Sequence, residues 1–217
     1  MYRMVLFTQW KWGRLALGAT VLAAFALPLV AALTAGSDTD PRLAQHTIET
    51  LALLGPVFPL VAALTALFVA VTAWGADHQG RHVYALSMPV TRSRFVLLRL
   101  GAALTLLLVP LVAFWVGALV AASATTLPPG LHTYPNLLAL RFALAAIVAF
   151  GFFFAIASAT ARTAGYVLGG LVAVMLVQLL LFALDSKVNL VGWLLQSLLV
   201  WPGPFDVFTG RWMLIDV

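Results

Sequence analysis

Long apolar runs are the feature that most constrains how this chain can fold. A helix needs about 20 apolar residues to cross the roughly 30 Å hydrocarbon core of a bilayer. Five runs reach that length, each rich in leucine, alanine, valine and phenylalanine all round, and they cover residues 15–35, 51–74, 95–122, 137–160 and 164–184. The pattern predicts an all-α integral membrane protein, a polytopic helical bundle with five clear spans.

Composition supports this class. Hydrophobic residues make up 63% of the sequence and charged residues 9%, whereas a soluble domain needs about 25% charged residues for its water-facing surface. We therefore expect a single transmembrane domain over residues 1–217, with no separate soluble domain. The chain has no cysteine, which excludes disulfides, thiolate nucleophiles and cysteine-ligated metals.

The basic residues predict the orientation of the chain. They are dispersed, so the net charge of +5 indicates topology and no nucleic-acid partner. The residues expected on one side are Arg3, Lys11, Arg14, Arg81, Arg92, Arg94 and Arg162, and those expected on the other are Arg42, Arg141 and Lys187. Because positive loops stay in the cytoplasm, the N-terminus is expected inside.

Two segments are predicted to lie at the membrane surface. Residues 1–14 combine aromatic and basic side chains, which is typical of an interfacial helix. The apolar run that follows is longer than the core of a signal peptide, which favours a retained span. Near the other end, residues 188–201 are apolar but too short to span, and Pro202 and Pro204 break any helix.

For residues 188–204 we therefore expect a re-entrant or interfacial segment, with a short helix over 190–200 and an exposed C-terminus outside. Trp193 and Trp201 suit the headgroup zone. The alternative is a kinked sixth span over 188–208, which would return the tail to the cytoplasm.

Several kinds of chemistry have no motif in this sequence. There is no G-x-x-x-x-G-K-[ST] phosphate loop, no G-x-S-x-G elbow and no H-E-x-x-H pair. We name no catalytic residue, and no metal site, because His78 and His82 lack a convincing third ligand. The only strong polar group that we identify at mid-depth is Gln178, which indicates an interhelical hydrogen bond or a group on a pathway. Gly165 and Gly169 form a small-xxx-small pair that favours close helix packing.

The segment 75–94, between the second and third runs, carries the most information. Val83 and Leu86 give it a small apolar face, and Pro89 ends the short helix that we predict there. Asp77 is expected near the start of that helix, where a negative charge suits the helix dipole. An apolar face on a cytoplasmic loop favours a docking surface, and the alternative is a basic topology anchor with a proline-defined entry into the next helix.

The same segment resembles permease subunits of ABC exporters of the type-2 family. The match consists of Asp77, Gly80 and the run Tyr84-Ala-Leu-Ser-Met-Pro-Val-Thr-Arg92, followed by an apolar span. In that family an acidic residue and a glycine precede a leucine-small-x-proline-x-x-arginine turn. The resemblance implies a coupling helix that docks on a separate ATPase, with contacts from Asp77, Gly80, Tyr84, Leu86, Ser87, Pro89 and Arg92. Family members usually have a clear sixth span, and this chain ends about where that span should begin.

The resemblance implies the membrane-spanning subunit of an ATP-driven ABC exporter. This subunit would form a homo- or heterodimer with a second permease copy in the lipid of the bacterial cytoplasmic membrane. It would hold no cofactor and would not be an enzyme, because ATP and Mg would bind the partner ATPase. The alternative is a structural or assembly membrane protein that scaffolds a larger complex and whose loop docks without turnover.

The chain alone should hydrolyse no ATP and should move no solute in response to a proton gradient. The reason is the missing phosphate loop and the expectation that the interior of the predicted spans lacks ionisable groups. Proteoliposomes that contain only this chain provide the measurement. Solute uptake driven by a pH step would contradict the prediction.

Overall fold

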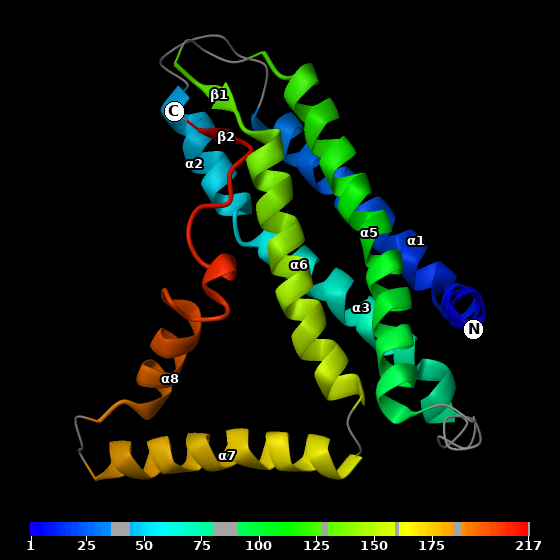
Figure 1. The fold of residues 1–217 in the computed structure, drawn as a ribbon. Helices are drawn as coiled ribbons and strands as arrows, with labels where there is room; N and C mark the ends of the chain where they lie inside the picture. The colour runs from blue at the N-terminus through cyan, green and yellow to red at the C-terminus, as the bar shows by residue number, and fades with distance from the viewer. Residues whose placement is uncertain (36–43, 80–90, 127–129, 159–160, 185–187, 217) are drawn as a thin grey trace. The chain divides into compact units, whose positions relative to one another are not determined.

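The computed structural model describes residues 1–35, 44–79, 91–126, 130–158, 161–184 and 188–216. They form two compact units (Figure 1). Unit 1 comprises Met1–Phe154 and Arg211–Val217, and unit 2 comprises Ala155–Gly210. The elements of unit 1 are α1 (Tyr2–Ala35), α2 (Ala44–Leu54), α3 (Val57–Gln79), α5 (Arg92–Ala124), β1 (His132–Thr133), most of α6 (Pro135–Ser158) and β2 (Ile215–Asp216).

Four helical segments of the described chain are long and apolar enough to cross a membrane. They are Tyr2–Thr34, Ile48–Gly75, Ser93–Ala124 and Pro135–Ser158, and they contain most of the first four predicted spans. The fifth predicted span coincides with a helix, α7 (Ala161–Ala183). Its part Val172–Ala183 is an apolar helical stretch that is shorter than a span. A helical membrane protein is therefore supported, and the fifth crossing stays a prediction.

Helix α1 is continuous but changes direction near its start. Gln9 bonds the Arg99 carbonyl and Phe25 lies against Gly117, so the two helices run parallel over this stretch. A straight α1 would place Tyr2 about 10 Å before Arg99, towards the start of α5. Instead, the Tyr2 hydroxyl lies 2.6 Å from Thr105 Oγ1, beyond Arg99. The first turns of α1 thus lie across α5, and they are seen nearly end-on in Figure 1.

The second predicted span consists of two helices. Helix α2 ends at Leu54 and α3 begins at Val57, with a turn at Gly55 and Pro56. Proline has no amide hydrogen and its ring blocks the preceding turn of a helix, which explains the break. The turn closes through the Gly55 amide, which donates to the Ala52 carbonyl at 3.2 Å, and through the Phe58 amide, which donates to the Gly55 carbonyl at 3.3 Å.

Helices α1 and α5 approach most closely where a glycine removes the side chain. A Cβ atom at Gly117 would collide with the Phe25 carbonyl oxygen and lie 3.2 Å from Phe25 Cα. On the other side of α1, a Cβ atom at Gly13 would lie 3.3 Å from Thr72 Oγ1 of α3. Small residues that bring backbones together are a usual basis of helix association in membranes, where there is no hydrophobic drive between helices.

The C-terminal tail is buried in unit 1. Strand β2 pairs antiparallel with β1, and the Tyr134 amide donates to the Leu214 carbonyl at 2.9 Å. Trp212 is 2% exposed and stacks on Phe58 at 6.3 Å between ring centroids. The tail therefore lies at the same end of unit 1 as the α5–α6 connection. The expectation of an exposed tail is wrong for these residues, because Trp212, Leu214 and Ile215 complete an aromatic and aliphatic core.

Unit 2 contains α7, α8 (Leu190–Leu199) and the short η2 helix (Asp206–Phe208). The bounds of α8 agree with the helix that we predict over residues 190–200. Pro202 follows one turn after α8 ends, and the Phe205 amide donates back to the Leu198 carbonyl at 2.9 Å. The chain thus turns sharply after α8, as the prolines predict.

We expect Gly117→Ala to destabilise unit 1 by about 1–3 kcal/mol, because the added methyl group forces α1 away from α5. Gly151→Ala in α6 is the matched control, since nothing lies within 4 Å of a Cβ atom there. Thermal unfolding of both variants in the same detergent provides the measurement. Equal melting temperatures for the two variants would contradict the close approach.

Candidate functional site: the base of the predicted coupling segment

The helices α3 and α5 flank the segment that resembles a coupling helix. Helix α3 extends to Gln79, past the predicted end of the second span at Trp74. Asp77 therefore lies in the last turn of α3 and not at the start of a separate short helix. The helix-dipole interpretation of Asp77 is wrong for this reason, because a helix end favours positive charge.

The other residues of the motif are placed as follows. Arg92 is the first residue of α5, with Thr91 as its N-cap. Gly80, Tyr84, Leu86, Ser87 and Pro89 lie outside the described residues. Their contacts with an ATPase stay predictions, and the structural information concerns the two helix ends that carry the segment.

Arg99 joins these two helices. It projects from α5 and is 7% exposed, and its Nη1 atom donates to the Ala73 carbonyl of α3 at 2.7 Å. The guanidinium carbon lies 4.8 Å from the ring centroid of Trp74 and 4.9 Å from that of Phe95. The cation is thus held between two aromatic rings while it bonds a backbone carbonyl, an arrangement that suits a planar guanidinium.

The sequence interpretation missed this cation. It named Gln178 as the only strong polar group at mid-depth, yet Arg99 lies inside the predicted span 95–122 and is buried. The signal was available, because an ionisable residue inside a span is costly and marks a functional site by default. The statement that the spans lack ionisable groups is therefore corrected.

Helix α1 and helix α6 also reach this base. The Gln9 side-chain amide donates to the Arg99 carbonyl at 3.4 Å, and Trp74 contacts Phe154 of α6 with ring centroids 5.5 Å apart. Two buried polar atoms here, Gln9 Oε1 and Trp74 Nε1, have no hydrogen-bond partner among the described residues.

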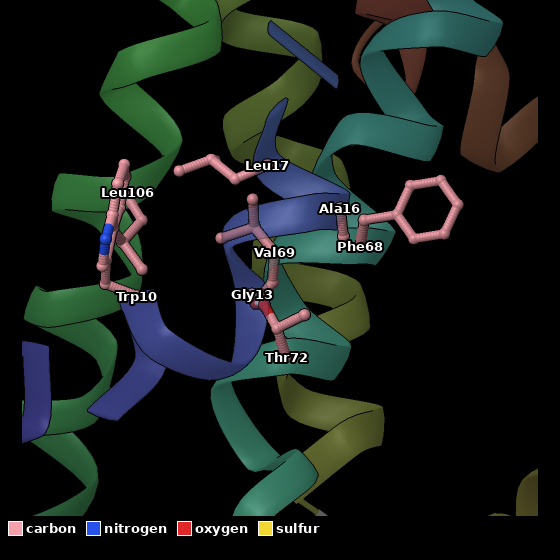
Figure 2. Close-up of a pocket in the computed structure, with 8 residues that line it drawn as sticks. All are labelled: Trp10, Gly13, Ala16, Leu17, Phe68, Val69, Thr72 and Leu106. Carbon is pink, nitrogen blue, oxygen red and sulfur yellow. Dashed lines mark hydrogen bonds between the residues drawn. The ribbon is translucent and has the colours of Figure 1, made fainter. Parts of the chain in front are cut away.

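A small recess lies where α1, α3 and α5 meet, and Figure 2 shows its lining. Gly13 of α1 faces Thr72 of α3, and Trp10 and Leu106 close one side of the recess. The cavity volume is about 10 Å³, which is close to the minimum for one water molecule. The recess is therefore a packing feature and cannot hold a solute.

Arg141 repeats the arrangement of Arg99 at the opposite end of unit 1. Its Nη1 atom donates to the Arg211 carbonyl at 2.6 Å, and its guanidinium carbon lies 4.9 Å from the ring centroid of Trp212. In both places an arginine bonds the carbonyl of one residue and covers the indole of the next. Arg99 makes these contacts with Ala73 and Trp74, and Arg141 makes them with Arg211 and Trp212 of the tail.

Gln178 belongs to α7, and its side chain contacts the start of α8. Its Oε1 atom accepts hydrogen bonds from the amides of Leu190 at 2.7 Å and Val191 at 3.3 Å, which are free donors at the start of α8. Gln178 therefore caps α8, which corresponds to the interhelical alternative. Gly165 and Gly169 both lie in α7, and nothing lies within 4 Å of a Cβ atom built at Gly169. Close helix packing at these two glycines stays a prediction, and a helix of a second chain would have to supply the contact.

Within the described ranges, no group of three or more histidine or acidic residues could hold a metal ion. The arrangement of Arg99, Trp74 and Phe95 performs no bond chemistry, and what it provides is a rigid junction between helices. No family model, curated protein or solved structure matches this chain. The function is therefore inferred from the chain's own residues.

Proposed function

We propose that this chain is the membrane-spanning subunit of an ATP-driven ABC transporter, working as an exporter. The observation that carries the proposal is the junction beneath residues 80–91. Two long apolar helices present a segment with the sequence of a coupling helix, and Arg99 joins those helices just below it. A plain topology anchor has no need of a buried cation at that position.

The junction supports a mechanical role. A push on the segment reaches α3 and α5 together, because the Arg99–Ala73 hydrogen bond and the contact of the Arg99 guanidinium with the Trp74 ring connect them. Trp74 passes the displacement to Phe154, the last residue of unit 1 before unit 2. Gln9 connects the same point to α1. Closely packed interiors transmit strain in this way.

In the proposed cycle, ATP and Mg bind only to the partner ATPase. Closure of the ATPase displaces residues 75–94, and the helices of unit 1 rearrange around a path shared with a second permease copy. This chain binds no nucleotide and has no catalytic residue. It lies in the cytoplasmic membrane of a bacterium with its N-terminus inside, in agreement with the basic residues at that end.

We also propose that residues 155–210 cross the membrane. Phe154 lies near one end of α6, and the tail rejoins unit 1 beside β1 at the other end. Because α6 is long enough to span, the intervening residues have to cross an odd number of times. Helix α7 supports a single crossing, since 23 residues extend about 34 Å. This makes five spans, with α8 at the outer side.

The chain should co-purify with a soluble ABC ATPase, and Tyr84→Asp or Leu86→Asp should weaken that contact while membrane insertion continues. A carboxylate on the apolar face would have to be desolvated at the interface. Tyr84→Phe, and Tyr134→Asp on an exposed residue at the other end of unit 1, are the controls. If both aspartate variants at 84 and 86 retain the ATPase, the segment is not the docking site and the scaffold alternative is favoured.

Single cysteines in this cysteine-free chain should establish the topology. With a membrane-impermeant maleimide on intact cells, His132→Cys should be labelled and Arg3→Cys should react only after the membrane is opened. Val188→Cys distinguishes the crossing element, because it is outside if α7 spans. Protection of Val188→Cys in intact cells would mean that α7 stays on the cytoplasmic side and that the residues after it cross.

A further inference from the structure

We infer that Arg99 is a positioning residue that sets the geometry of the coupling segment. The inference rests on the proposed function and adds a role for a residue outside the coupling motif. Arg99 does not contact the ATPase or a solute. It acts by holding the last turns of α3 against the first turns of α5, which fixes the separation of the two helices that flank residues 80–90 in the sequence.

The position of the contact along both helices suits this role. Ala73 precedes the end of α3 at Gln79 by about 9 Å, and Arg99 follows the start of α5 at Arg92 by about 10 Å. The hydrogen bond therefore crosses the two helices at the same level beneath the segment. A contact nearer the bundle centre would leave both ends free to separate, whereas this one fixes them one to two turns away.

The contact is more easily explained by geometry than by stability. A buried cation loses its hydration, and an apolar side chain of similar volume is often as stable or more stable in such a place. An apolar core would join α3 and α5 without fixing their register, but a hydrogen bond to one carbonyl fixes it.

An arginine is suited to this position and a lysine is not. The planar guanidinium lies between the rings of Trp74 and Phe95 and still directs an N–H group at the Ala73 carbonyl. An ammonium group is a compact point charge without a stacking face. Arg99→Lys thus retains the charge and loses the directional contact, which separates the effect of charge from the effect of geometry.

The chain offers a matched control in Arg141. It makes the same two contacts, a carbonyl hydrogen bond of 2.6 Å and an indole contact of 4.9 Å, but with the tail. Arg141→Met removes a similar pair of contacts from a half-buried arginine at the end of unit 1 away from the coupling segment. If both Arg99→Met and Arg141→Met produce the same effect, that effect comes from the loss of an arginine contact in general and not from the position of Arg99.

The first measurement is amide hydrogen exchange of the whole chain in lipid nanodiscs. In Arg99→Met we expect exchange in residues 74–79 and 93–98 to accelerate about tenfold, as for the loss of a hydrogen bond to a charged group. Arg99→Lys should give a smaller acceleration of exchange at the same residues. If the Arg99→Met protein cannot be produced in folded form, the exchange of Arg99→Lys provides the test. Arg141→Met should accelerate residues 211–216 and leave 74–79 unchanged. Unchanged exchange at 74–79 in the Arg99 variants would overturn the inference, whatever the ATPase does.

The second measurement is the affinity of the reconstituted chain for its ATPase subunit. We expect Arg99→Met to weaken the affinity at least about tenfold, as for a lost charge-assisted contact, while Arg141→Met binds as the wild type does. If the exchange changes and Arg99→Met still binds normally, the positioning role is wrong. If the wild type binds no ATPase, the proposed function fails, and the exchange result still decides whether Arg99 joins the two helices.

Discussion

The close approach of α1 and α5 is the contact on which the rest of unit 1 depends. Without a side chain at Gly117, the α5 backbone comes against the Phe25 carbonyl, and the two helices then run side by side. Helix α3 packs against α1 at Gly13 and Thr72. In lipid the apolar effect gives no preference for one helix contact over another, so backbone proximity has to select the partner. The three helices form the frame, and the end of α6 reaches it through Trp74.

Two arginines then close the two ends of unit 1 with the same chemistry. Each donates a hydrogen bond to a backbone carbonyl and lies over the indole ring of the residue that follows this carbonyl. At one end this joins α3 to α5, and at the other it joins α6 to the tail. Both guanidinium groups belong to spans and lie near span ends, where a cation is less costly than at the bilayer centre. The same pair of contacts thus serves a helix junction and a chain terminus.

The sequence predicts the helices well and their interruptions less well. Run length and apolar content give four of the long helices, and Pro202 and Pro204 predict the end of α8. The break at Gly55 is missed because a proline inside an apolar run is compatible with a span. Arg99 is recognisable in the sequence as an ionisable residue inside a predicted span, but its partners Ala73 and Trp74 are not, because they are distant in sequence. Gly117 is no more conspicuous than Gly151 in the sequence, since only the facing backbone distinguishes them.

The pairing of β1 with β2 has a consequence for the order in which the molecule is assembled. Trp212 is synthesised after residues 155–210 have been made, yet it covers Phe58, which enters the membrane much earlier. Until then the rings of Phe58, Phe114 and Phe142 lack Trp212 as a partner. The last layer of the unit 1 core can therefore be added only after the residues that separate Phe154 from Arg211 have been translated.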